Sequence, residues 1–174
     1  MIQRIPSTHG VTSERLVFRH TSMDDLSWWM EYINSAEAIR FMSLVVGSEA
    51  SCREFIQRSM DRRVTDGSGL NAIIEQATGK PVGMIGLLTQ VVDGVDELEI
   101  GYHLLPSAWG KGYATEAAIA CKEFAQHHQL VPSVISLIDH ENFASQAVAK
   151  RNGMAFEKDT VHRGTPAMVW RVAL

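Results

Sequence analysis

The sequence predicts an α+β fold with one mixed, mostly antiparallel sheet that is flanked by helices. In the middle of the chain, runs over 70–76 and 82–92 and a third that contains Glu99 follow one another with only short turns between them, which favours an antiparallel meander. Near the C-terminus, runs over 154–159 and 167–173 lie close enough to pair as a hairpin. Helical periodicity precedes the meander and separates it from the hairpin, as an α+β order requires.

Four elements are expected before the meander. They are a short strand over 15–21, a helix over 23–34, a second short helix around 36–42, and a helix from about 49 to 64 that stops near Asp66 and Gly67. Ser51 and Glu54 have capping-box spacing within the last helix. Residues 1–12 contain no apolar run, and we expect them to form a flexible tail of the single domain 1–174.

The strand around Glu99 begins after an Asp93-Gly94 turn and ends before Pro106. Its apolar and polar residues alternate, which predicts one buried and one polar face, with Leu98, Ile100, Tyr102 and Leu104 on the first and Glu97, Glu99, Gly101 and His103 on the second. Further on we expect an amphipathic helix from 113 or 114 to about 126, a strand over 133–138, and a helix over 142–152 that Gly153 stops. The total is about seven strands.

Composition limits the classes of function. The 174 residues are 45% apolar and 21% charged, which suits one domain with a sizeable core. Sixteen basic against 20 acidic residues give a net charge of −4, which argues against nucleic acid or an acidic membrane as partner. Two isolated cysteines, Cys52 and Cys121, favour neither a disulfide scaffold nor a metal site. No run has the length of a membrane span or the pattern of a secretion signal, so we expect a cytoplasmic protein.

The glycine-rich stretch over 109–116 joins a strand to a helix. Main-chain N–H groups in such a turn converge at the positive end of the helix dipole, so the turn is suited to hold a phosphate. A Walker A loop is excluded because Leu105 stands where its first glycine would be and Gly112 stands where its Ser or Thr would be. A dinucleotide fingerprint is also excluded, because Thr115 replaces its third small residue and the preceding strand alternates.

Trp109-Gly110-Lys111-Gly112-Tyr113-Ala114 resembles the coenzyme A pyrophosphate loop of the GNAT N-acetyltransferases, Gln/Arg-x-x-Gly-x-Gly/Ala. Trp109 departs from the Gln/Arg position in a way that is typical of the RimJ/RimL-like ribosomal-protein N-terminal acetyltransferases. The resemblance extends from Glu14-Arg15-Leu16 to the final strand and includes Glu99-Ile100-Gly101-Tyr102 and the segment 142–153. It implies the GNAT acyl-CoA N-acyltransferase fold, acetyl-CoA as co-substrate without a metal, and direct transfer of the acetyl group to a primary amine. The acceptor would be a peptide N-terminus or a small amine.

The resemblance also implies roles for individual residues. Glu99 matches the glutamate of the Glu-Ile-Gly-Tyr pattern and is the candidate general base, the other interpretation being a solvated strand glutamate. The tyrosine that often protonates the leaving thiolate is absent, because its position is Ala149. Ser145 is the candidate substitute, although Asn142 at a helix N-cap with Ser145 at N3 is also ordinary capping. Asn142 is further expected to contact the pantetheine arm.

Cofactor contacts are expected along two segments. The backbone of His103, Leu104 and Leu105 would pair with pantetheine like an added strand, and the Leu104 N–H would polarise the thioester oxygen. The amides from Gly110 to Thr115, through Lys111, Gly112, Tyr113 and Ala114, would hold the pyrophosphate. The Lys111 side chain either reaches an outer phosphate or is simply exposed, and Trp109 either contacts the cofactor or wedges under the turn.

Trp28, Tyr32 and Met42 are candidates for the wall of the acceptor site, because family members build that wall from their first helices; ordinary packing is the alternative. Two functions remain open on the sequence. One is the N-acetyltransferase, and the other is a catalytically weak CoA-binding sensor or interaction module. The resemblance also leaves a homodimer open, since dimers are frequent in the family.

Overall fold

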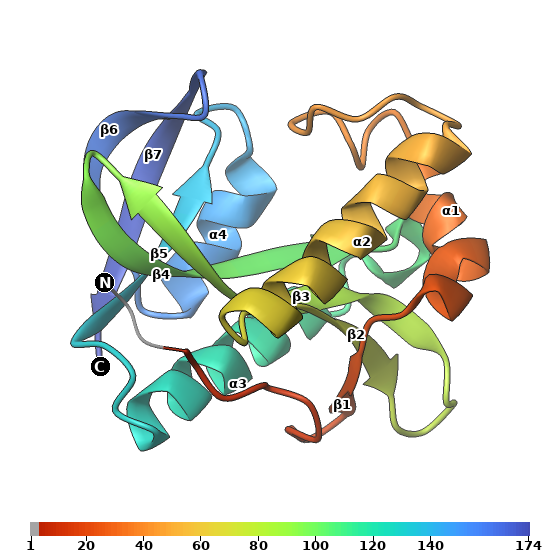
Figure 1. Ribbon diagram of the computed structural model, residues 1–174, viewed down its shortest axis with the longest axis horizontal. Helices are drawn as coiled ribbons and strands as arrows, with labels where there is room; N and C mark the ends of the chain where they lie inside the picture. Colours follow the sequence, from red (N-terminus) through yellow and green to blue (C-terminus); the bar gives the residue numbers. More distant parts are fainter. Residues whose placement is uncertain (1–3) are drawn as a thin grey trace.

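The strands form a single seven-stranded sheet in the order β1-β2-β3-β4-β5-β7-β6, as seen in the computed structural model, which describes residues 4–174 (Figure 1). All neighbours are antiparallel except β4 and β5. The expected α+β class and the mixed, mostly antiparallel sheet are therefore confirmed. The elements are β1 Leu16–His20, the 3-10 turn η1 Met23–Asp25, α1 Leu26–Asn34, α2 Glu49–Thr65, β2 Gly69–Glu75, β3 Pro81–Val92, β4 Val95–Leu104, η2 Pro106–Ala108, α3 Tyr113–His127, β5 Ser133–Ile138, α4 Phe143–Arg151, β6 Ala155–His162 and β7 Thr165–Ala173.

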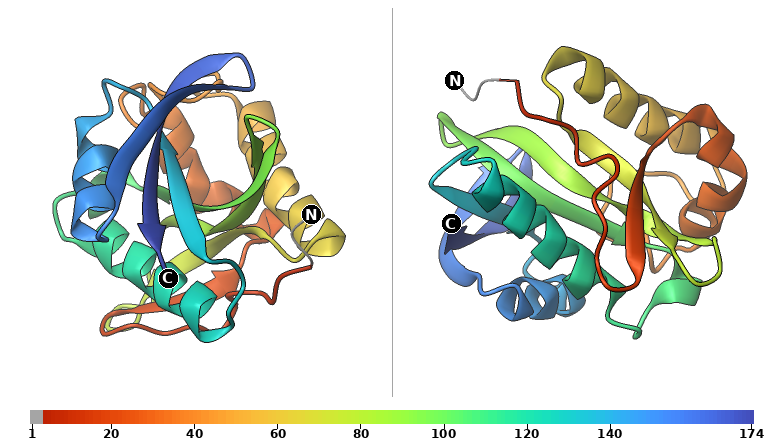
Figure 2. Two further views of the ribbon diagram at one scale, coloured as in Figure 1. Left: turned by 90° about the vertical axis from the view of Figure 1, so that its left-hand side faces the viewer. Right: turned by 90° about the horizontal axis from the view of Figure 1, so that it is seen from below.

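Helices cover both faces of the sheet. α1 and α2 pack together on one face, and α3 and α4 lie side by side on the other (Figure 2). The middle of β4 is consequently covered on both sides, and Leu98, Glu99, Ile100 and Gly101 are all buried. The prediction of a solvated polar face for this strand is wrong at Glu99 and Gly101, because a second layer of helices covers it.

Two further expectations differ from the structure. The short helix around 36–42 does not form, since residues 36–41 make consecutive turns. Residues 4–12 of the expected tail lie along the fold, where Ile5 is 5% exposed and its N–H donates to the Asp66 carbonyl at 2.9 Å. Thr12 forms an isolated bridge with Val17, which extends this docking to the edge of β1. Residues 1–3 lie outside the described part of the chain.

Helix caps explain where two helices that frame the site begin. The Ser48 side chain accepts a hydrogen bond from Ser51 N–H at 3.1 Å and starts α2, so the cap lies upstream of the Ser51–Glu54 pair. Asn142 starts α4, and its Oδ1 accepts from Ser145 N–H at 3.1 Å. Caps of this kind satisfy N–H groups that have no intrahelical acceptor and contribute about 1 kcal/mol each.

Candidate active site

A cleft opens where β4 and β5 separate. The two parallel strands are in register at Glu99 and Ile135, and beyond this pair the side chain of Ser136 bridges them by donating to the Ile100 carbonyl at 2.9 Å. The cleft has a volume of about 1180 Å³ and is lined from β4, β5, α3, α4 and the loop after α1. It contains most of the residues that the sequence predicted for the site, namely Tyr32, Met42, Glu99, His103, Leu104, Trp109, Gly110, Gly112, Ala114, Thr115, Asn142 and Ser145.

The glycine-rich turn presents unpaired amides to this cleft. Gly110 and Gly112 have φ of 73° and 82°, a left-handed conformation that glycine adopts without steric cost. Gly112 is the N-cap of α3, and no side chain of the described residues caps that end. The first N–H groups of the helix therefore have no intrahelical acceptor. A Cβ at Gly110 would meet nothing within 4 Å, so the space beside the turn is open to a ligand. This is the geometry of an anion site at a helix N-terminus.

The side chains of Trp109, Lys111 and Tyr113 point in different directions. Tyr113 is 5% exposed and packs inward, with its hydroxyl donating to Glu75. Lys111 is exposed on the outside of the turn and is absent from the cleft lining. Trp109 is 39% exposed and donates from Nε1 to the Leu104 carbonyl at 3.0 Å, so it braces the turn against β4 rather than filling space under it. The side chains of Lys111 and Tyr113 therefore do not line the cleft.

The register between β3 and β4 determines which main-chain N–H of β4 points to the edge where β4 separates from β5. Leu105 N–H donates to the Val82 carbonyl at 2.9 Å, and Leu104 pairs with Gly83. Because the groups of an antiparallel strand point alternately to its two edges, His103 and Leu105 turn toward β3 while Leu104 turns toward the cleft. Of the three residues predicted to pair with pantetheine, Leu104 is the one whose N–H is directed to the open edge.

Glu99 lies at the point where the strands separate. Its side chain is 9% exposed and accepts a hydrogen bond from Gln90 Nε2 at 2.7 Å. Burial raises the pKa of this carboxyl above its usual range, while the Gln90 amide, the Leu137 N–H and the Arg62 guanidinium oppose the rise. A carboxyl with a raised pKa at the end of a cleft is suited to act as a general base.

His103 and Tyr32 form a second polar pair on the α1 and α2 face of β4. The Tyr32 hydroxyl and His103 Nδ1 are 3.0 Å apart, and both rings pack against Phe55. Burial lowers the pKa of the His103 imidazole to about 4 and raises that of the Tyr32 phenol, so both groups are neutral near pH 7. They place uncharged polar groups on this side of the cleft.

The α4 side of the cleft is organised by Tyr102, which sequence reasoning had treated only as an apolar strand residue. Its hydroxyl donates to the Ser145 carbonyl at 2.8 Å and holds the first turn of α4 against β4. Tyr102 is part of the Glu-Ile-Gly-Tyr pattern, and this was the available signal. Burial raises the pKa of the phenol, so it remains a neutral donor.

Trp28 is not brought to the cleft. Its Nε1 donates to Asp25 Oδ1 at 2.8 Å, and its ring lines a separate hollow with Phe18 and Pro81. Tyr32 and Met42 are the members of the expected acceptor wall that line the cleft. Trp28 and Tyr32 are four residues apart and lie on the same side of α1, but Trp28 is one turn nearer the N-terminus, beside Asp25, and does not reach the cleft.

Two other features are absent from residues 4–174. In that range no group of three or more His, Cys, Asp or Glu side chains is placed to hold a metal ion. None of the helices that the structure describes is long and apolar enough to cross a membrane.

Comparison with known proteins agrees with the geometry. The family described as "Acetyltransferase (GNAT) domain" matches residues 15–155. The uncharacterized protein YkkB of Bacillus subtilis is 32% identical over 120 residues, which are 68% of this chain and 69% of that protein. A crystal structure of an acetyltransferase from Agrobacterium tumefaciens has a TM-score of 0.77 at 25% identity and covers 98% of this chain and 95% of its own.

The fold is shared with RimL, a ribosomal L7/L12 α-N-protein acetyltransferase solved in complex with coenzyme A. That structure has a TM-score of 0.74 at 18% identity and covers 93% of this chain and 96% of its own. RimL is thus among the structural neighbours, as the resemblance to the RimJ/RimL-like branch leads one to expect. A glycine-rich turn at the N-terminus of α3, a parted pair of parallel strands and a family match over most of the sequence lead to one conclusion: the chain belongs to the GNAT family and is an N-acetyltransferase.

Proposed function

We propose that this chain transfers the acetyl group of acetyl-CoA directly to a primary amine, either a peptide N-terminus or a small amine. The observation that supports the proposal most directly is the position of Glu99, where the two sides of the cleft meet. The amides of the 110–115 turn and the open edge of β4 lie on the α3 and α4 side, whereas His103 and Tyr32 lie on the α1 and α2 side. Glu99 stands between them at the separation of β4 and β5.

The turn and the β4 edge would bind and align the co-substrate. The unpaired amides of the first α3 turn hold the diphosphate, and the Leu104 N–H donates to the thioester oxygen as negative charge develops there. Asn142, which lines the cleft while it caps α4, contacts the pantetheine arm. These contacts place the acetyl carbonyl at the mouth of the acceptor side.

Two side chains transfer protons during the reaction. As the amine nitrogen attacks the carbonyl carbon and the C–S bond breaks, the nitrogen loses a proton, which Glu99 accepts directly or through water. The departing thiolate takes a proton from the Ser145 hydroxyl, which regains one from solvent in the same step. A free thiol has a pKa of about 8.5, so the thiolate is a good leaving group and this second transfer has a modest effect.

The acceptor must reach the site as a neutral amine. At pH 7 a lysine side chain of pKa ~10.4 is neutral about one part in 2,500, whereas an α-amino group of pKa ~7.8 is neutral about 14% of the time. An N-terminal amine is therefore the easier nucleophile, and a peptide N-terminus is the acceptor class that we favour.

Release of free thiol from acetyl-CoA tests the proposal. The purified protein is assayed with a panel of peptides and small amines, and turnover with at least one of them is expected. Glu99→Gln should lower kcat by at least about a hundredfold, within the usual range for a general base, while the affinity for CoA changes little. Glu97→Gln is the matched control, because Glu97 lies two residues earlier, pairs with Arg171 at 2.6 Å and does not line the cleft.

Binding of CoA without thiol release for any amine would favour the sensor or interaction module instead. An unchanged rate in Glu99→Gln across the pH range would remove Glu99 as the base.

A further inference from the structure

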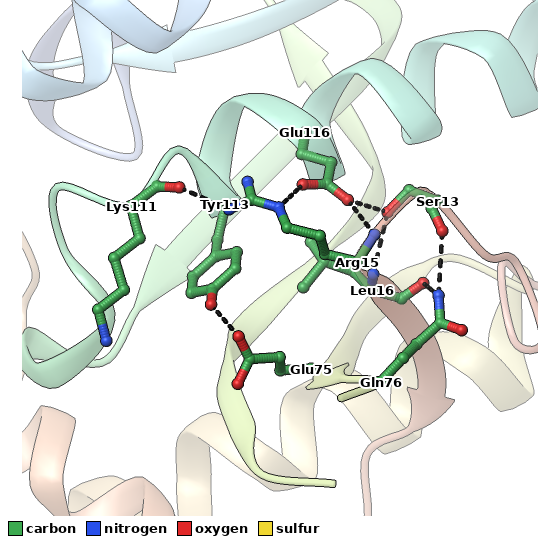
Figure 3. Close-up of polar contacts among 8 residues, drawn as sticks. All are labelled: Ser13, Arg15, Leu16, Glu75, Gln76, Lys111, Tyr113 and Glu116. Carbon is green, nitrogen blue, oxygen red and sulfur yellow. Dashed lines mark hydrogen bonds and ion pairs between the residues drawn. The ribbon is translucent and has the colours of Figure 1, made fainter. Parts of the chain in front are cut away.

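The glycine-rich turn is held from outside by the segment before β1 (Figure 3). Glu116, in the first turn of α3, accepts three hydrogen bonds from this segment: Ser13 Oγ at 2.6 Å, Arg15 N–H at 2.7 Å and Arg15 Nε at 2.7 Å. Ser13 and Arg15 precede Glu116 in the sequence by 103 and 101 residues. The carboxylate therefore fastens two distant parts of the chain together.

Arg15 also contacts the turn on the other side of Gly112. Its Nη1 donates to the Lys111 carbonyl at 3.0 Å, and its guanidinium carbon lies 4.6 Å from the centre of the Tyr113 ring. The Tyr113 hydroxyl in turn donates to Glu75 on β2 (Figure 3). One arginine thus connects residues 111, 113 and 116, which surround the left-handed glycine at the start of the helix.

This arrangement fixes the conformation that presents the amides. Gly112 has no side chain of its own with which to hold its φ of 82°, and the first helical bond, Glu116 N–H to the Gly112 carbonyl, is 3.1 Å long. A turn that is already ordered does not lose further conformational freedom when a ligand binds. Preorganised amides should therefore bind the diphosphate with higher affinity than a flexible turn would.

The charge of Glu116 makes Arg15 necessary for a second reason. Glu116 lines the cleft one turn from the amides, so its carboxylate would repel a bound diphosphate. Burial raises the pKa of this carboxyl, but the hydrogen bonds from Ser13 and Arg15 outweigh burial and the net shift is downward, which keeps it ionised. The Arg15 guanidinium cancels the charge at 2.7 Å.

We propose that Arg15 is a positioning residue for acetyl-CoA, which orders the pyrophosphate turn through Lys111 and Tyr113 and neutralises Glu116 beside the phosphates. The proposal rests on the proposed function, because it requires a diphosphate in the turn. It assigns a role in the binding of the co-substrate to the segment before β1, where the sequence patterns indicated only a flexible tail and a short strand.

Calorimetric titration with CoA provides the test. Arg15→Gln is expected to weaken CoA binding by at least about tenfold, with kcat at saturating acetyl-CoA within about twofold of wild type. Arg15→Gln/Glu116→Gln should bind CoA more tightly than Arg15→Gln alone, because the uncompensated carboxylate is gone. The penalty in Arg15→Gln should shrink as salt is added, since ions screen the repulsion.

Arg19→Gln is the matched control. Arg19 lies on β1, is 41% exposed against 42% for Arg15, and pairs with Asp25 at 2.5 Å. It does not contact the turn, so this variant is expected to lose comparable thermal stability without a change in CoA affinity.

Wild-type affinity in Arg15→Gln, while wild type itself binds CoA, would overturn this inference and leave the proposed function intact. Absence of CoA binding by wild type would instead refute the proposed function. If Arg15→Gln does not fold, Arg15→Lys decides, because it keeps the charge but loses the paired donors. It is expected to raise KM for acetyl-CoA several-fold at unchanged kcat, and an unchanged KM would overturn the inference.

Discussion

Removing the hydrogen bond between Gln90 and Glu99 should move the acid limb of the pH profile to higher pH. Gln90 Nε2 donates to Glu99 Oε2 at 2.7 Å and stabilises the ionised carboxylate. Methionine at position 90 has a similar length and no donor. A hydrogen bond to a charged group contributes about 1.5–3 kcal/mol, and one pKa unit corresponds to about 1.4 kcal/mol, so the pKa of Glu99 should rise by about one to two units.

The acid limb moves to higher pH because Glu99 acts as the base. Glu99 is active only when ionised, and burial already raises its pKa, so activity is lost as the pH falls through that raised value. In Gln90→Met the loss should begin about one to two pH units higher, while the plateau at alkaline pH is retained. The assay is kcat/KM for thiol release measured from about pH 5 to 9.

Gln57→Met is the matched control, because Gln57 also donates to a carboxylate, Asp61 Oδ1 at 2.7 Å, but on an exposed face of α2. Its acid limb should coincide with that of wild type. A folded Gln90→Met protein with an unmoved acid limb would refute Glu99 as the titrating base.

Three further predictions concern Gly112 in the turn, Ser145 at the cap and His103. Gly112→Ala places a Cβ at a φ of 82° and 3.5 Å from Arg15 Nη2, so it should lower the free energy of unfolding by about 1–2 kcal/mol and weaken CoA binding in calorimetry. Gly79→Ala is the control, because Gly79 has a φ of 68° with nothing within 4 Å of the added Cβ, and it should destabilise the protein without changing CoA binding. Ser145→Ala should lower kcat without lowering the melting temperature, because the cap uses Ser145 N–H and Asn142 Oδ1; an equal kcat would show that Ser145 is not the acid. The pKa of His103 is about 4 against 6.5 when unfolded, so its contribution to stability is complete above pH 6.5 and is lost as the pH falls toward 4. His103→Gln should flatten that dependence in urea titrations, and an unaltered slope would contradict the assignment.

Local patterns were sufficient to predict the elements that form the floor of the site. The Asp93-Gly94 turn, the start of α4 at Asn142 and the helix after Gly112 all follow from short-range chemistry, namely left-handed residues, side-chain caps and apolar periodicity. These are the features by which a single sequence indicates structure reliably.

Tertiary contacts explain what the sequence did not reveal. The alternation of β4 is real, but a second layer of helices buries Glu99, and no pattern within the strand indicates that layer. The segment 36–41 forms turns instead of a helix, and it contacts the core through Ile39, which is 3% exposed, and through the partly buried Ala38. The contacts of Arg15 with Glu116 and Lys111 span about 100 residues and carry no local signature.

The central claim is that the main-chain amides at the start of α3 hold the diphosphate of coenzyme A. Isothermal titration of the purified protein with CoA and with acetyl-CoA tests it most directly. Saturable binding with one site per chain, weakened by Gly112→Ala, is the result that we predict. Absence of heat with either ligand at millimolar concentration would contradict it.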